Sequence, residues 1–166
     1  MAITGGYSRS PEDLIPKVRD EWVKLVAEWE KSPQAKKYGK VIITMTRRTQ
    51  DCQLALIAQG RETLASVNAK RIKAGMTPIK QQENVKVTWV KPEDVAKAPH
   101  CRGIAIDFFL DSNADGKVDS KDWNEDDGFI AFGKFAKSKG WIWGGNVSVG
   151  GDFKTQNDLP HIQWGW

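Results

Sequence analysis

The sequence predicts an α+β fold in which a small antiparallel sheet packs against helices on one side. Two kinds of pattern lead to this prediction. Short segments, most of them alternating between apolar and polar residues, are expected to be strands at 40–46, 84–89, 104–109, 141–143 and 161–164. Longer segments with apolar residues three or four positions apart are expected to be helices at 10–31, 49–59, 62–74 and 128–139.

The composition is that of one packed domain, which we expect to span residues 1–166 as a monomer. Forty per cent of the residues are hydrophobic and eight are tryptophan, which excludes a disordered chain. The net charge of +4 comes from scattered lysines, so it predicts a mild attraction to polyanions. No basic stripe is interleaved with aromatic residues, and we therefore expect no nucleic-acid partner.

No apolar run approaches the length of a membrane helix, so no stable membrane insertion is expected. The first residues lack a basic region followed by an apolar one, which predicts a chain made in a cytoplasm without a signal peptide. The two cysteines, Cys52 and Cys101, are too few for a disulfide framework and are expected to be free thiols.

The capping residues of the helices support their predicted bounds. Ser10 is the candidate N-cap of the first helix, and Asp13 is placed to bond back to it in a capping box. Pro16 is awkward inside this span, so the first turn is expected to kink or to stand apart. Gly60 follows the second helix at the position that favours a left-handed residue. A short helical turn is expected from Lys91 towards Ala98.

The central strand carries one carboxylate on its polar face. Ile104, Ile106 and Phe108 point one way, whereas Ala105 and Asp107 point the other way. His100 precedes Asp107 by seven residues, and on a straight strand this odd spacing would place the two on opposite faces. The chain can bend at Gly103, which would fold the imidazole of His100 back over the carboxylate of Asp107.

The chain has one other histidine, His161, which follows Pro160 and shares a strand face with Gln163. A catalytic zinc ion takes three protein ligands from imidazole and carboxylate groups and leaves one position for water. We therefore predict a zinc site made by His100, Asp107 and His161. Cys101 is a weaker candidate ligand than its neighbour His100. The alternative is two histidines with no metal.

A run of oxygen-bearing side chains follows the central strand. Positions 1, 3, 5, 9 and 12 of a twelve-residue calcium loop carry such side chains, position 6 is glycine, and position 7 offers a backbone carbonyl. The residues are Asp111, Asn113, Asp115, Gly116, Lys117, Asp119 and Asp122. The sequence thus predicts an EF-hand-like calcium loop inserted after the central strand, although Asp122 replaces the usual glutamate. A solvated acidic turn is the alternative.

Two ordered motifs carry a family resemblance: His100-x-x-Gly103-x-Ala105-x-Asp107 and, downstream, Asp158-x-Pro160-His161. Together with Arg48-Thr49, Gln53 and the stretch Ala58 to Gly60, they resemble the VanY/VanX-type family of zinc peptidases. Segments at 67–69, 74–79 and 87–89 resemble most closely its phage endolysin branch, the L-alanyl-D-glutamate peptidases. The resemblance covers about residues 40–166.

The resemblance implies a zinc metallopeptidase that cuts the L-Ala–D-Glu bond of peptidoglycan stem peptides. It assigns Arg48, with Arg47 as the alternative, to substrate binding or to stabilising charge on the attacked carbonyl. Asp158, three residues before a ligand, is the expected general base, with Asp152 as the alternative. The family usually has a serine where this chain has Ala98, and this departure concerns substrate contacts rather than the metal.

On this interpretation the chain is one catalytic domain without a separate cell-wall-binding module, and it acts on the wall after release across the inner membrane. Two other functions remain open. A D,D-carboxypeptidase or dipeptidase of the same family would use the same metal and base. A non-catalytic, calcium-dependent wall-binding module would keep the site but not use it, and the presence of Asp158 argues against this reading.

Overall fold

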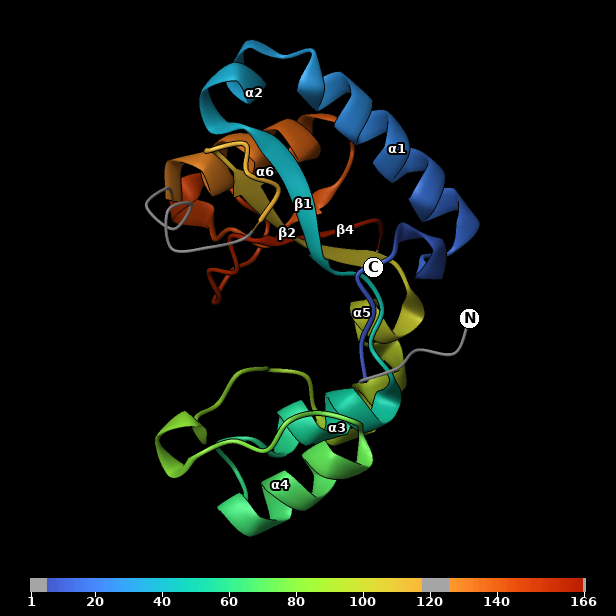
Figure 1. Ribbon diagram of the computed structural model, residues 1–166, viewed down its shortest axis with the longest axis vertical. Coiled ribbons are helices and arrows are strands. Elements are labelled where there is room, and N and C mark those ends of the chain that lie inside the picture. Colours follow the sequence, from blue (N-terminus) through green and yellow to red (C-terminus); the bar gives the residue numbers. More distant parts are fainter. Residues whose placement is uncertain (1–5, 118–125, 166) are drawn as a thin grey trace.

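A four-stranded antiparallel sheet forms the centre of the computed structural model, which describes residues 6–117 and 126–165 (Figure 1). The strand order is β1-β2-β4-β3. The strands are β1 (Lys40–Met45), β2 (Ala105–Asp111), β3 (Ile142–Trp143) and β4 (His161–Gln163). Each neighbouring pair is antiparallel, which confirms the predicted α+β fold and the small antiparallel sheet.

Helices cover one face of this sheet. They are α1 (Pro16–Glu30), α2 (Pro33–Tyr38) and α6 (Asp126–Ser138). The apolar face of β2, with Ile106, Phe108 and Leu110, packs in the same core as Trp29 of α1 and Phe132 of α6. The ring centroids of Trp29 and Phe132 lie 5.1 Å apart in an edge-to-face arrangement. The polar face of β2 is therefore left for other contacts.

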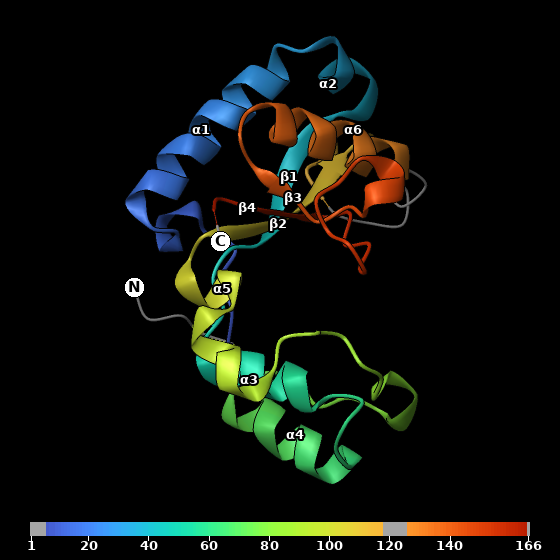
Figure 2. The same ribbon diagram turned by 180° about the vertical axis from the view of Figure 1, so that it is seen from behind.

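The chain between β1 and β2 forms a second lobe, joined to the sheet lobe through a narrow neck (Figures 1 and 2). Its helices are α3 (Gln50–Ala58) and α4 (Leu64–Lys73), with short 3-10 segments η2 (Gln81–Glu83) and η3 (Pro92–Lys97). The short helix α5 (Pro99–Arg102) lies in the neck and leads into β2. The hydroxyls of Thr49 and Thr63 cap α3 and α4, as the sequence of both segments favours.

The expected helix at 10–31 is divided. Residues Pro11–Asp13 form a separate 3-10 turn, η1, and α1 begins only at Pro16, whose ring fits the first position of a helix. Ser10 caps η1 by accepting the N–H of Glu12. The predicted capping box is wrong, because the carboxylate of Asp13 accepts the hydroxyl of Ser8 at 2.5 Å instead.

The prediction of a strand at 84–89 is also wrong. This segment has no strand beside it, and side chains of the second lobe bind its backbone instead. Arg61 donates to the carbonyl of Thr88 in this segment, and Gln59 donates its amide to the carbonyl of Glu83 just before it. The helix α2 and the 3-10 turn η4 (Val147–Val149) were not predicted. Among the helices that the structure describes, none is long and apolar enough to span a lipid bilayer.

Candidate metal centre

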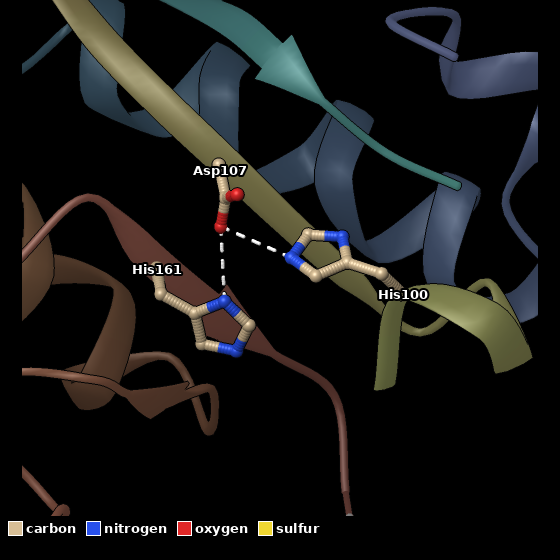
Figure 3. Close-up of side chains that lie close together, drawn as sticks. All are labelled: His100, Asp107 and His161. Carbon is tan, nitrogen blue, oxygen red and sulfur yellow. Dashed lines mark hydrogen bonds and ion pairs between the residues drawn. The ribbon is translucent and has the colours of Figure 1, made fainter. Parts of the chain in front are cut away.

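Asp107 and His161 meet because they lie directly opposite each other in the pairing of β2 with β4. Opposed residues of an antiparallel pair have their side chains on the same face, close enough to touch. The Nδ1 atom of His161 lies 2.9 Å from Oδ1 of Asp107, on the sheet face away from the helices (Figure 3).

His100 reaches the same carboxylate from outside the sheet. It lies on α5, and Gly103 ends that helix in the left-handed conformation, with φ of 69°, before the chain turns into β2. This is the bend that the odd spacing of His100 and Asp107 required. The Nε2 atom of His100 lies 3.1 Å from the same Oδ1 atom of Asp107. The structure therefore brings together the three predicted ligands, whose candidate atoms all lie within 4.8 Å of one another.

The tautomer of His100 follows from its second nitrogen. Nδ1 lies 2.9 Å from the backbone carbonyl oxygen of Thr46, which can only accept, so Nδ1 carries a proton and donates it. Thr46 is fully buried, and its own hydroxyl donates to the carbonyl of Ser10 at 2.9 Å. In the neutral imidazole, Nε2 then directs a lone pair towards Asp107.

Gln163 settles the tautomer of His161 in the same way. Its amide nitrogen donates to the carbonyl of Gly165 at 3.0 Å, so its Oε1 atom is the one that faces Nε2 of His161 at 3.1 Å. Nε2 of His161 therefore donates, and Nδ1 directs its lone pair towards Asp107. The sequence analysis placed Gln163 on the same face as His161 but gave it no role. The shared strand face was the feature of the sequence from which a role for Gln163 could have been predicted.

Two lone pairs and one carboxylate oxygen thus converge with no hydrogen between them in the neutral state of the imidazoles. Such an arrangement calls for a cation, either a proton or a metal ion. The electrostatics agree. Although burial acts against the charged forms, the Asp107 carboxylate raises the pKa of His161 above its usual value. Burial also opposes ionisation of Asp107, but the two imidazoles hold the pKa of its carboxyl well below its usual range.

The donor set fits a zinc ion. Two imidazole nitrogens and a carboxylate oxygen make a three-ligand set that leaves a position for water. Each imidazole donates its other N–H to an oxygen, the outer hydrogen bond that metal-binding histidines typically make. Cys101 is not part of the group, because its sulfur is directed towards the carbonyl of Thr49 at 3.9 Å. Among the described residues, this is the one set of three such groups.

A cavity of about 650 Å³ opens over these three residues, between the two lobes. The sheet lobe contributes a wall at 152–156 together with Asp158, His161 and Gln163. The second lobe contributes Gln53 and a wall at 87–90. The sequence analysis expected a strand at 84–89 there and gave it no functional role. The cavity lies within the size range of ligand sites in proteins.

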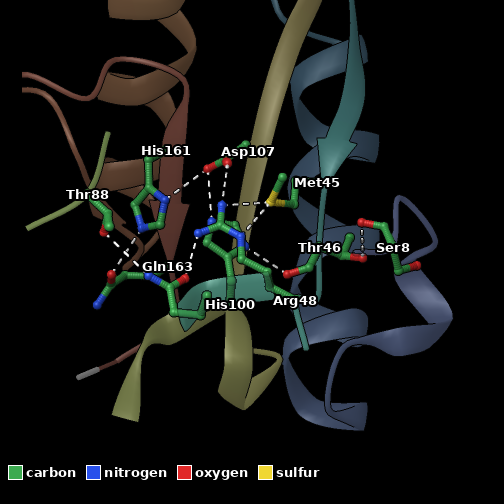
Figure 4. Close-up of polar contacts among 10 residues, drawn as sticks. Ser8, Met45, Thr46, Arg48, Thr88, His100, Asp107, His161 and Gln163 are labelled. Atoms are coloured by element: carbon green, nitrogen blue, oxygen red, sulfur yellow. Dashed lines mark hydrogen bonds and ion pairs between the residues drawn. The ribbon is translucent and has the colours of Figure 1, made fainter. Parts of the chain in front are cut away.

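Arg48 lies where β1 leads into α3 and lines this cavity. Figure 4 shows its side chain beside Asp107. Its Nη2 atom lies 3.9 Å from Oδ2 of Asp107, and its Nη1 atom donates to Oε1 of Gln53 at 2.7 Å. Arg47, the alternative, is exposed and does not line the cavity. The structure thus places Arg48 rather than Arg47 beside the candidate metal ligands.

The two candidate bases differ in their surroundings. Both oxygens of Asp152 are engaged: Oδ2 accepts the N–H of Trp143 at 2.9 Å, and Oδ1 pairs with Lys137 at 2.8 Å. The carboxylate of Asp158 has no such partner among the described residues and is exposed to the cavity. Partial burial there raises the pKa of Asp158, and the charge of Asp107 adds to this, while His161 opposes it.

Close packing holds Asp158 beside the candidate metal ligands. Its N–H donates to the carbonyl of Gly144 at 2.8 Å, and the N–H of Gly144 donates to the carbonyl of His161 at 2.8 Å. A Cβ atom at position 144 would lie 2.5 Å from the carbonyl oxygen of Asp158 and 3.0 Å from Cβ of His161. Only glycine permits this approach, which sets the candidate base and the candidate ligand side by side.

The structure describes the first half of the predicted calcium loop. The carboxylate of Asp111 accepts the N–H groups of Asp115 and Gly116, and the Oδ1 atom of Asn113 also accepts from Asp115. Asp119 and Asp122 lie outside the described residues, so the full set of predicted calcium ligands stays a prediction. Lys117 is described, and its N–H donates to the Asp115 carboxylate at 2.9 Å.

No family model matches this chain, and no curated protein matches it in sequence. Among solved structures, the chain resembles a variant of VanY, a vancomycin-resistance D,D-pentapeptidase from a VanB-type resistance cassette, solved in complex with Zn(II). The identity is 13%, the TM-score is 0.49, and the match covers 91% of this chain and 72% of that chain.

Proposed function

We propose that this chain is a zinc-dependent peptidase that hydrolyses peptidoglycan stem peptides. The observation that carries the proposal is the convergence of His100 Nε2, His161 Nδ1 and Asp107 Oδ1. Both imidazoles are oriented from behind by hydrogen bonds, at the floor of an open cavity. A zinc ion held there would act as a Lewis acid and lower the pKa of a bound water.

The residues around the centre supply the remaining parts of a hydrolytic site. Asp158 has a free carboxylate with a raised pKa, so it is suited to take a proton from the attacking water and to return it to the leaving amine. Arg48 is always charged and lines the cavity 3.9 Å from Asp107. It is placed to stabilise negative charge that develops on the attacked carbonyl.

The bond we propose is that between L-Ala and D-Glu, and the biological role is wall degradation in phage lysis of a bacterial host. This choice rests on the sequence motifs that resemble the endolysin branch. We further propose that the loop at 111–122 binds Ca²⁺ and steadies β2. Asp111, its first ligand, is the last residue of the strand that carries Asp107.

Digestion of purified peptidoglycan by the zinc-loaded protein, followed by mass spectrometry, tests the activity. New fragments with an N-terminal D-Glu are expected. Release of D-Ala instead would assign the chain to the D,D-carboxypeptidases. Binding to the wall without any released fragment would contradict a peptidase altogether.

The metal is tested separately by measuring bound zinc. The wild-type protein should carry about one zinc ion, and His161→Ala should lose both the metal and the activity. Cys101→Ser is the matched control, because the Cys101 sulfur lies outside the group, and it should keep its zinc. Stoichiometric zinc in His161→Ala would contradict the ligand assignment.

A further inference from the structure

The wall of the cavity that belongs to the second lobe has the features of an unpaired strand edge. From Lys86 to Val90 the chain runs without a turn or a bend. In Figure 1 this segment, between η2 and η3, arches along the side of the second lobe that faces the sheet lobe. Val87 and Trp89 line the cavity, yet 43% and 55% of their surfaces are exposed. Val85, two residues earlier, is 57% exposed.

The hydrogen bonds of this segment are used on one edge only. In an extended chain, the N–H and C=O of one residue point to the same edge, and those of its neighbours point to the other edge. The carbonyl of Thr88 accepts from Arg61 at 2.6 Å, so this edge faces its own lobe. Among the described residues, the N–H and C=O groups of Val87 and Trp89 have no hydrogen-bond partner.

Polar side chains connect this wall to the metal centre (Figure 4). The hydroxyl of Thr88 accepts the amide of Gln53 at 3.4 Å, and Gln53, which is almost fully buried, accepts from Arg48 at 2.7 Å. Arg48 in turn lies 3.9 Å from Asp107. The free edge is thus held at a set position relative to the residues that would carry out the reaction.

We propose that the substrate binds as an extended peptide whose backbone pairs with the free edge of Val87 and Trp89. This inference rests on the proposed peptidase function and specifies how its substrate is held. Addition of a peptide strand to an open edge is a common mode of recognition, in which the backbone supplies affinity and alternate side chains supply selectivity. Val87 and Trp89 would then contact side chains on one face of the bound peptide.

Hydrogen exchange tests the pairing directly. The zinc-loaded Asp158→Asn variant, which should bind without turnover, is titrated with the synthetic peptide L-Ala–γ-D-Glu–L-Lys–D-Ala. The amide hydrogens of Val87 and Trp89 should exchange more slowly when the peptide is bound. Peptide-free glycan strands, prepared by amidase digestion, form the second arm. Protection of these two amides by glycan but not by peptide would overturn the proposal.

A pair of substitutions at one position separates the backbone from the side chain. Val87→Pro removes the N–H, and the loss of one hydrogen bond should raise KM by roughly threefold to tenfold with little change in kcat. Val87→Ala keeps the N–H and should change KM less. Trp89→Ala should also raise KM, by about tenfold. The melting temperature of each variant verifies that it is folded.

The outcomes distinguish this inference from the proposed function. Cleavage of peptidoglycan by the wild type, with no protection of Val87 or Trp89 and equal KM values for the two Val87 variants, would overturn the pairing and leave the peptidase intact. Protection of the two amides without cleavage by the zinc-loaded wild type would support the pairing and overturn the peptidase function. If Val87→Pro does not fold, the exchange measurement on the Asp158→Asn protein still decides the pairing.

Discussion

His161 and Gln163 lie two residues apart on one face of β4, and the Nε2 atom of His161 donates to the Oε1 atom of Gln163 at 3.1 Å. Only 1% of the surface of Gln163 is exposed, so water does not readily take its place. This contact sets which nitrogen of His161 faces Asp107. We therefore propose that Gln163 is a positioning residue for the candidate metal ligand His161.

Replacing Gln163 should weaken metal binding. Gln163→Leu removes the acceptor for His161, and loss of such an outer hydrogen bond typically costs tenfold to a hundredfold in metal affinity. Gln163→Glu restores an acceptor and should recover most of the affinity. Competition with a zinc chelator measures both variants.

Gln59→Leu is the matched control for Gln163→Leu. Gln59 is also buried and hydrogen-bonded, but its amide binds the carbonyl of Glu83 in the second lobe. The Gln59→Leu variant should therefore be less stable than the wild type but bind zinc with the same affinity. Equal zinc affinity in Gln163→Leu and the wild type would show that Gln163 only supports the sheet.

Asp158→Asn should separate metal binding from turnover. The amide keeps the size of the carboxylate but cannot accept a proton, so zinc should remain bound while kcat falls by roughly two to four decades. Asp152→Asn is the control, because both oxygens of Asp152 are engaged by Trp143 and Lys137. This variant should keep most of the activity. Near-normal hydrolysis by the zinc-loaded Asp158→Asn protein would assign the proton transfer to another group.

The stability of the metal-free protein should depend on pH in two opposite ways. The pKa of His161 is raised in the folded state, so its contribution is complete below its ordinary value of 6.5 and is lost as the pH rises through the raised value. The pKa of Asp107 is lowered, so its contribution is present above its ordinary value of 3.8 and is lost as the pH falls below it.

Zinc should offset the loss of stability that the metal-free protein shows as the pH rises. The metal competes with the proton at His161, so the stabilisation by zinc should increase as the pH rises through the raised pKa. Melting temperatures of chelated and zinc-loaded protein, measured between about pH 5 and pH 9 around the ordinary histidine value, test this. A constant difference between the two curves would contradict competition at His161.

Calcium should raise both the melting temperature and the rate of wall hydrolysis. Asp111 ends the strand that carries Asp107, and small displacements of a catalytic group cost large factors in rate. Titration of zinc-replete, calcium-free protein with micromolar to millimolar calcium covers the range of such loops. Asp111→Ala combined with Asp115→Ala should abolish the response and keep zinc bound. If neither quantity changes in the wild type, the loop is only an acidic turn.

The convergence of the three candidate metal ligands could be predicted because local rules determine it. Alternation on β2 placed Asp107 on the polar face, the position of Gly103 allowed His100 to fold back, and Pro160 defined the face of His161. The wall at 87–90 could not be predicted in this way. Its alternating pattern is that of a strand, but whether a strand is paired depends on which segments lie beside it, and this is decided by the tertiary structure.

Other differences have similarly physical causes. The role of Gln163 depends on the orientation of an amide, which the distant carbonyl of Gly165 determines. The two-lobed shape depends on where the long connection between β1 and β2 packs, and this cannot be predicted from the composition. Helix α2 was missed although Ser32 accepts the N–H of Ala35 and Pro33 occupies the first position, because its short span has no apolar stripe.

The connection between β1 and β2 has a consequence for the order of folding. These strands are neighbours in the sheet, but residues 46–104, including the whole second lobe, separate them in the sequence. Their pairing has to close a long loop, whereas α3 and α4 make mainly local contacts. We expect the sheet, and with it the approach of Asp107 to His161, to form late. Zinc should then slow unfolding far more than it accelerates folding, since its ligands meet only after the main barrier is crossed.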